Sequence, residues 1–265
     1  MSAQNWDDYD LGQKGSATIS KLCYRLAVAC RKMVMTAQCA ETSRSSEFGY
    51  VCRRCSLCCR DKRIQINPYE LARLARAQGE TTSEFRKRWT LDGQGTTLGQ
   101  KEDGTCVFLG PQGCEVHADR PLVCRLYPLA RHVLTDRGEY FTTLEGHPQS
   151  QGEFTNRGTV ADYLAAQGAL PFMDVADAYF WWLCYAHERL DLTVEAIRTG
   201  PDKDVHCDLL DMDAMIARHS AATGYPEPID LDGRAHLHLQ LLYEALANRE
   251  NGHAEETPGR DEAAR

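Results

Sequence analysis

Apolar residues recur at helical spacing in two early segments of the chain. Pro68–Gln78 presents Leu71, Leu74 and Ala75 to one side, with Asn67 before it as a cap and Gly79 after it as a stop. A second, shorter helix is expected to begin at a cap on Thr82 or Ser83 and to end near Trp89. Turn-forming residues indicate two hairpins between apolar arms, Thr96–Leu109 turned at residues 102–104 and His132–Leu144 turned at residues 136–138.

From residue 159 onward the pattern predicts only helices. Thr159 is expected to cap one helix, and Asp174 is expected to cap another over Val175–Leu190. Two more helices are predicted, Leu209–His219 and Gly233–Asn248. Val175–Leu190 is apolar on almost every side, above all between Tyr179 and Tyr185, so this helix is either fully buried or covered by a protein partner.

These elements predict an α+β fold with a small, irregular, cysteine-rich core and a mostly α-helical C-terminal half. The expected parts are a weakly ordered leader (1–45), a metal-binding domain (46–145), a helical extension packed on it (146–248) and a disordered, charged tail (249–265). Within the leader, Ile19–Ala40 has helical spacing. Translation is suspected to begin at Met33 or Met35 instead of Met1.

Composition excludes several classes of protein. The 265 residues are 43% hydrophobic and 26% charged, as in globular proteins, and the longest apolar run, Ala178–Ala186, is too short to cross a membrane. The net charge of −8 argues against a nucleic-acid-binding protein. Acidic residues near Met1 do not suit a signal peptide, so we expect a cytoplasmic protein.

Cysteine is the unusual residue, with 12 in the chain. Four thiols occur in the eight residues Cys52-x-x-Cys55-x-x-Cys58-Cys59, and overlapping CxxC units can present several thiolates to one metal. In a reducing compartment, such clusters indicate metal binding or catalysis and not disulfides. The expected ligands are Cys52, Cys55, Cys58, Cys59, Cys106, Cys114 and Cys124. The metal is expected to be zinc or iron, with a [4Fe-4S] cluster as one form of the latter.

The remaining cysteines and the nearby histidines carry weaker signals. Cys23, Cys30 and Cys39 lie in the doubtful leader, Cys184 suits a helical core, and Cys207 beside His206 is a weak ligand pair. His117 is either an additional ligand or a surface residue. Arg120 and Arg125 bracket Cys124, where positive charge favours thiolates and where they could support the ligands.

The cysteine pattern resembles the YkgJ-type cysteine-cluster proteins, the zinc- or iron-chelating CxxCxxCC family. Matching text comprises Cys52–Cys59, Cys106-x-Phe-Leu, Cys114-x-Val-His and Arg120-Pro-x-x-Cys124-Arg-x-Tyr-Pro. The resemblance spans roughly residues 50–130 and implies chelation of zinc or iron. A relative of the family, the flagellin lysine methylase, uses S-adenosylmethionine and is similar only around the cysteine motif.

Three hypotheses follow, and catalysis is left undecided among them. The first is a functional metal site, as an iron–sulfur centre or a zinc–iron chelating site. The second is a structural zinc module that binds a protein partner, with the apolar helix around Tyr179–Tyr185 as a candidate face. The third is an enzyme, either an S-adenosylmethionine-dependent protein lysine methyltransferase or a thiol-redox enzyme.

Overall fold

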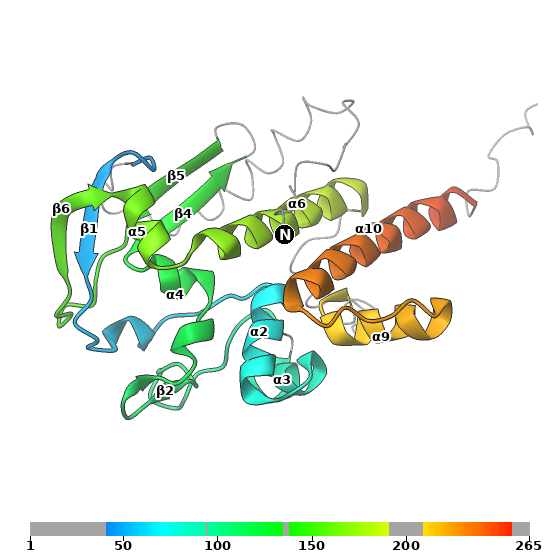
Figure 1. Cartoon of the computed structure of the whole chain (residues 1–265), viewed down its shortest axis with the longest axis horizontal. Coiled ribbons are helices and arrows are strands. Elements are labelled where there is room, and N and C mark those ends of the chain that lie inside the picture. The colour runs from blue at the N-terminus through cyan, green and yellow to red at the C-terminus, as the bar shows by residue number, and fades with distance from the viewer. Residues whose placement is uncertain (1–40, 94, 135–137, 191–208, 256–265) are drawn as a thin grey trace, which may run out of the picture.

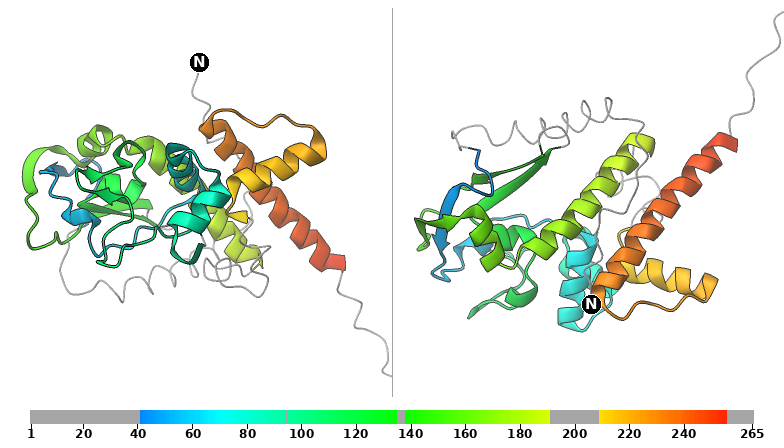
Figure 2. Two further views of the ribbon diagram at one scale, coloured as in Figure 1. Left: turned by 90° about the horizontal axis from the view of Figure 1, so that it is seen from below. Right: turned by 45° about the horizontal axis from the view of Figure 1, so that its top comes forward.

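A computed structural model describes residues 41–93, 95–134, 138–190 and 209–255 (Figure 1). These residues form seven α-helices and three two-stranded antiparallel sheets, which confirms the predicted α+β class. The sheets lie at one end of the molecule, and the long helices α6 (Leu170–Leu190), α9 (Met212–Thr223) and α10 (Leu231–Glu255) extend toward the other (Figures 1 and 2). The predicted leader helix, both alternative start residues and the pair His206–Cys207 lie outside the described residues.

The sheet of β1 and β6 joins distant parts of the chain. β1 (Glu47–Val51) pairs with β6 (Glu153–Thr159), with Val51 opposite Glu153 and Tyr50 opposite Phe154. The register shifts between Glu47 and Gly49, where a Cβ on Gly49 would lie 2.8 Å from the carbonyl oxygen of Arg157. Glycine is therefore required at this close approach of the two strands.

Of the two predicted hairpins, one has both of its arms paired along their length, with residues 135–137 of its turn outside the described residues. β4 (Leu129–Leu134) pairs with β5 (Gly138–Thr143) around the predicted turn, although the ladder starts three residues before His132. The 102–104 turn also forms, because Lys101 N–H donates to Thr105 at 2.8 Å. The arms of this second hairpin meet near the turn, at Gln100 and Cys106 and through a bond from the N–H of Val107 to Gly99. Residues further from the turn pair with different segments. β2 (Leu109–Gly110) and β3 (Gly113–Cys114) follow as a two-residue ladder.

The first two helices follow their capping signals. α2 (Pro68–Gln78) has the predicted bounds, with a reciprocal capping box between Asn67 and Glu70. α3 (Thr82–Trp89) is capped by Thr81, so the predicted cap at Thr82 or Ser83 is wrong. The hydroxyls of these two residues instead donate to the carboxylate of Asp211, at 2.5 Å each, and join α3 to the segment before α9.

Of the next two helices, one begins at its predicted cap and the other begins earlier than predicted. α5 (Val160–Ala166) is capped by Thr159 as expected. α6 (Leu170–Leu190) begins four residues before Asp174, so Asp174 does not cap it. Pro171 accounts for the early start because proline suits the first turn of a helix, where its missing N–H leaves no bond unmade.

The C-terminal helices pack side by side. α9 (Met212–Thr223) follows an Asp211 cap and ends at Gly224, and both bounds lie later than the predicted 209 and 219. α10 (Leu231–Glu255) is longer than the predicted Gly233–Asn248 and extends into the segment expected to be a disordered tail. α10 lies against both α6 and α9.

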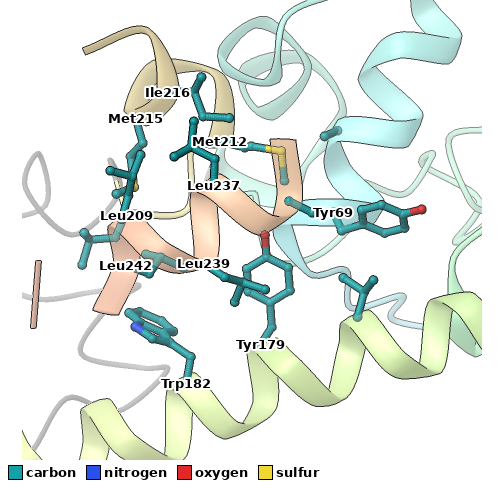
Figure 3. Packing of buried hydrophobic residues seen from close by; sticks show 14 of the residues in the cluster. Tyr69, Tyr179, Trp182, Leu209, Met212, Met215, Ile216, Leu237, Leu239 and Leu242 are labelled. Carbon is teal, nitrogen blue, oxygen red and sulfur yellow. The ribbon is translucent and has the colours of Figure 1, made fainter. Parts of the chain in front are cut away.

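One large apolar core holds the long helices together (Figure 3). Tyr179 and Trp182 of α6 face Leu239 and Leu242 of α10 within it, and Tyr69 extends the core to α2. Trp181, the neighbour of Trp182, is 41% exposed. α6 therefore buries one face and leaves part of its apolar surface uncovered by the described residues. None of the described helices is both long and apolar enough to span a membrane.

Two smaller cores support the cysteine-rich end. One lies under β1, β5, α5 and the start of α6, and includes Phe48, Phe141 and Leu164. The other, which we name the α2–α3 core, includes Leu71, Leu74, Phe85 and Phe108, and three cysteines pack against it. The short loops that carry the thiols are thus attached to apolar clusters through a few side chains each.

Candidate metal centre

The CxxCxxCC segment is an exposed loop that leaves β1 and leads toward α2 (Figure 1). No side chain between residues 52 and 63 is buried. Three non-glycine residues of this loop have positive φ, namely Arg54, Ser56 and Asp61. The turn η2 (Leu57–Cys59) places Cys58 and Cys59 next to each other, with 4.0 Å between their sulfurs. Apolar burial does not hold this conformation.

Two other chain segments bring thiols to the same place. The backbone N–H of Cys106 donates to the carbonyl of Cys59 at 2.9 Å, and Cys114 lies on β3, opposite Leu109. Cys124 is in the short helix α4 (Leu122–Leu126). Cys106, Cys114 and Cys124 all pack against the α2–α3 core, and the Cys106–Cys59 backbone bond brings the distant CxxCxxCC loop beside them.

Electrostatic interactions show which thiols lie close together. The hydrogen bond between the sulfurs of Cys58 and Cys59, with help from the positive charge of Arg120, lowers the pKa of Cys58 to about 7. The same contact raises the pKa of Cys59, because its ionisation would put a second negative charge beside Cys58. We call Cys58, Cys59, Cys106, Cys114 and Cys124 the inner thiols, since each interacts with at least two of the others.

Burial acts against ionisation of three inner thiols. Removal from water raises the pKa of Cys106, Cys114 and Cys124, and neighbouring thiolates raise those of Cys114 and Cys124 further. Several thiolates packed so closely repel one another. A bound cation would remove this repulsion, because metals bind the deprotonated thiol.

Four cysteines share a local hydrogen-bond pattern. In each case the N–H of a residue donates to the sulfur of the cysteine two positions earlier in the chain. The N–H of Arg54 donates in this way to the sulfur of Cys52, at 3.4 Å. Backbone hydrogen bonds from Leu57 to Cys55, from Phe108 to Cys106 and from Val116 to Cys114 have the same spacing. A backbone N–H aimed at sulfur stabilises the thiolate, and together with one from Gln151 it lowers the pKa of Cys55.

Cys52 and Cys55 lie at the margin of the group, and we call them the outer thiols. Cys52 is exposed, and its charge acts on Tyr163 of α5. Cys55 interacts with Gln151 and Ser150 on one side and with Cys58 on the other. The eight described cysteines, which include Cys184 on α6, form no disulfide among themselves.

Positive charge and one histidine flank the inner thiols. Arg120 donates to the carbonyl of His117 at 2.8 Å and to Gln167 Oε1 at 3.0 Å. Burial and the nearby Arg120, Arg54 and Arg125 lower the pKa of His117, which keeps its ring neutral. Arg120 also lies 3.2 Å from His117 Nδ1, so this nitrogen already has a protein partner.

Glu70 fixes the helix that carries Cys124. Its carboxylate is 4% exposed, caps α2 through Asn67 and accepts the N–H of Leu122 at 2.6 Å. Burial raises the pKa of Glu70. The N–H of Leu122 belongs to the first turn of α4, which would otherwise lack a partner, so Glu70 links the start of α2 to the start of α4.

The donor atoms are thiol sulfurs, which suit a thiophilic metal. The thiols lie near one another but do not enclose an ion. Among the described residues, no three side chains of cysteine, histidine, aspartate or glutamate converge on one point that could hold a metal. The inner thiols are gathered, stabilised by backbone N–H groups, and flanked by guanidinium groups. Thiolates with these neighbours fit zinc or iron in donor type.

Sequence reasoning found the thiols and missed several groups around them. Glu70 was visible as a capping residue, but nothing in the sequence pointed to its bond with Leu122, 52 residues away. Gln167 and Tyr163 were also missed, since their contacts with Arg120 and Tyr127 join segments distant in sequence. Only the proximity of Arg120 and Arg125 to Cys124 in the sequence gave a usable signal.

Comparison with known proteins gives one match. A family model named CxxCxxCC, with the description "Putative zinc- or iron-chelating domain", matches residues 51–151. The match confirms the resemblance to the cysteine-cluster family and includes all seven predicted ligands. No curated protein and no solved structure matches the chain.

Proposed function

We propose that this protein chelates zinc or iron through cysteine thiolates at the centre formed by the inner thiols. The outer thiols, Cys52 and Cys55, complete the ligand set. All seven candidates belong to the segment that matches a chelating-domain family.

The observation that carries the proposal is that five thiols from three chain segments lie near enough for their charges to interact. Cys58 and Cys59 come from the exposed loop, Cys106 and Cys114 from the segment around β2 and β3, and Cys124 from α4. Buried free cysteines that serve only as core residues have no reason to gather, since their thiols gain nothing from one another. The repeated backbone N–H···S contacts support the same conclusion because they favour thiolates.

A bound metal would supply two things here. It would neutralise the mutual repulsion of the thiolates, and it would join the exposed loop to the α2–α3 core. The chain's own residues hold the donors in place, through the Cys106–Cys59 backbone bond and through the anchoring of α4 by Glu70. Iron with inorganic sulfide would in addition supply a redox centre.

The proposal includes a division of the chain and a compartment. Residues 46–145 would form the metal-binding domain and residues 146–248 a helical extension packed on it. A reducing cytoplasm is the compartment in which so many thiols would stay available to a metal.

Metal and acid-labile sulfide analysis tests the proposal, on full-length protein purified without oxygen and without added metal. Iron with sulfide and a broad absorbance near ~400 nm would indicate an iron–sulfur centre. Zinc in a colourless protein would indicate a chelating or structural zinc site. Protein that is folded and monodisperse but contains neither metal, and takes up neither on addition, would overturn the proposal.

A pair of serine variants then assigns the ligands. Cys58→Ser is expected to lower the bound metal by at least half, because it removes a thiolate at the centre of the inner group. Cys184→Ser is the matched control, since it changes a cysteine on α6 outside the matched segment. Equal metal content in Cys58→Ser and the unmutated protein would contradict the ligand assignment.

A further inference from the structure

Two guanidinium groups lie beside the inner thiols, that of Arg120 just before α4 and that of Arg125 within it, and neither has a carboxylate partner among its described hydrogen bonds. Arg125 is 7% exposed and donates only to main-chain carbonyls, those of Arg120, Ala118 and Gln167, at 3.0, 2.6 and 3.1 Å. Arg120 donates to His117 and to the neutral amide of Gln167. A third arginine near Arg125, Arg73, is already paired with Asp119 at 2.7 Å.

Such an arrangement is costly in the absence of nearby negative charge. Burying a guanidinium is unfavourable unless it is hydrogen-bonded and paired, and two lie close enough here for each to disfavour the other's charge. Asp119 and Glu70 offset part of this cost at Arg125 through longer-range attraction, although neither carboxylate accepts a hydrogen bond from the two arginines. The thiolates are the other negative groups nearby. The charge of Arg120 acts on Cys58 and Cys114, and Arg125 follows Cys124 directly in α4.

Both guanidiniums are held from outside the matched segment 51–151. Gln167 follows α5 and accepts from Arg120 through its side chain and from Arg125 through its main chain. Phe172, in the first turn of α6, lies flat under Arg125, with 3.9 Å from the guanidinium carbon to the ring centre. Stacking of this kind adds to the three hydrogen bonds of Arg125 and helps to fix the orientation of its guanidinium.

We infer that Arg120 and Arg125 are the counter-charges of the metal–thiolate centre, and that Gln167 and Phe172 of the helical extension position them. A centre with more thiolate charge than its metal neutralises is anionic, and the two guanidiniums offset this excess. The helical extension then contributes to metal binding, because its residues influence the affinity of the centre for metal. This inference rests on the proposed function and specifies which residues outside the cysteine motif serve it.

Metal affinity measured by chelator competition tests the inference on the full-length chain, with Zn²⁺ as the probe. Arg120→Gln should weaken Zn²⁺ binding about 10- to 100-fold, the usual effect of removing a residue that supports metal ligands. Arg120→Lys keeps the charge and should recover most of the affinity. Gln167→Leu releases Arg120 without changing any charge and should weaken binding less than Arg120→Gln. Lys87→Gln, which removes an exposed positive charge from α3, should have no effect.

The outcomes separate the two proposals. An unmutated protein that binds no Zn²⁺ or iron contradicts the proposed function itself. Zn²⁺ binding that is equally tight in the unmutated protein, Arg120→Gln and Gln167→Leu contradicts the counter-charge inference alone. Arg120→Lys as weak as Arg120→Gln would also overturn it, because the requirement would then be for shape and not for charge. Circular dichroism confirms that each variant is folded, and Gln167→Leu keeps the test valid if Arg120→Gln does not fold.

Discussion

The exposed cysteine loop and the helices α6, α9 and α10 keep their backbones in place by different means. In the loop, residues 52–63 bury no side chain and include three non-glycine residues at positive φ. In the helices, a continuous apolar core covers one face of each element, and even the polar pair Tyr179–His238 inside it is hydrogen-bonded at 2.8 Å. The helices are thus stabilised by burial, whereas the loop depends on hydrogen bonds and on whatever its thiols bind.

The largest expected effect comes from removing the metal. A chelator should increase hydrogen exchange in residues 52–63 and 105–125 while α6 and α10 stay protected. Structural zinc contributes on the order of 10 kcal/mol in small zinc-dependent peptides, so the difference between the regions should be large. Equal loss of protection in the helices would show that the two regions unfold as one unit and are not stabilised separately.

Next in size is the loss of a core side chain from the helical region. Trp182 is 1% exposed, so Trp182→Ala should lower the free energy of unfolding by about 3–5 kcal/mol. Trp181→Ala is the matched control on the same helix, where the side chain is 41% exposed, and should cost much less. Urea titration measures both. Trp182→Ala protein that remains folded should keep its metal. Loss of metal from it would show that the helical core and the metal centre depend on each other.

Acidification should weaken the helical region through His238. This buried imidazole accepts from Tyr179 and donates to the carbonyl of Leu209, and burial lowers its pKa to about 4. The unfolded chain therefore takes up a proton near pH 6.5 while the folded protein does not. Stability from this residue is complete above that pH and falls by about 3 kcal/mol as the pH decreases toward 4. Asp211 and Asp213 are the nearby charges that oppose this shift.

A non-titrating variant isolates the contribution of His238. His238→Gln keeps a donor and an acceptor but has no proton to gain, so the difference in urea midpoint between pH 7 and pH 5 should be smaller than in the unmutated protein. Identical pH dependence in the two proteins would assign the effect to other groups.

The smallest predicted effect concerns Glu70, which belongs to both regions. Its helix α2 contributes to the helical core through Tyr69, and its carboxylate holds α4. In Glu70→Gln, the side-chain amide group faces one of the two backbone N–H groups that the carboxylate accepts, which leaves that N–H without an acceptor. The free energy of unfolding should fall by about 1–3 kcal/mol. Metal binding should also weaken, because α4 and its Cys124 would shift. Glu84→Gln changes the equivalent, exposed residue of the α3 capping box and should leave the metal unaffected. Unchanged metal affinity in folded Glu70→Gln would show that α4 needs no such anchor.

Prediction from sequence succeeded where the determining residues are neighbours. α2 was predicted to the residue because Asn67, Glu70 and Gly79 are all local signals. The cap of α3 was missed because Thr81, Thr82 and Ser83 all suit a cap, and Asp211, far along the chain, decides among them. The pairing of β1 with β6 was not predicted, since β6 is mostly exposed and lacks alternating apolar residues.

The same distinction applies to the candidate site. The seven cysteines are visible in the sequence because their spacing is itself the signal. Their division into inner and outer thiols, and the contacts of Gln167 and Phe172 with the two arginines, depend on how distant segments meet. Local sequence patterns do not encode these tertiary contacts.

The pairing of Val51 with Glu153 places the two ends of the thiol-bearing segment on adjacent strands. The chain leaves the β1–β6 ribbon at residue 52 and returns to it at residue 152, which gives this segment the connectivity of an insertion. A circularly permuted chain with its new termini inside the 102–104 turn would keep every residue pair between β1 and β6. Sequence changes within the segment can therefore accumulate or be exchanged as a block while its two attachment points stay fixed.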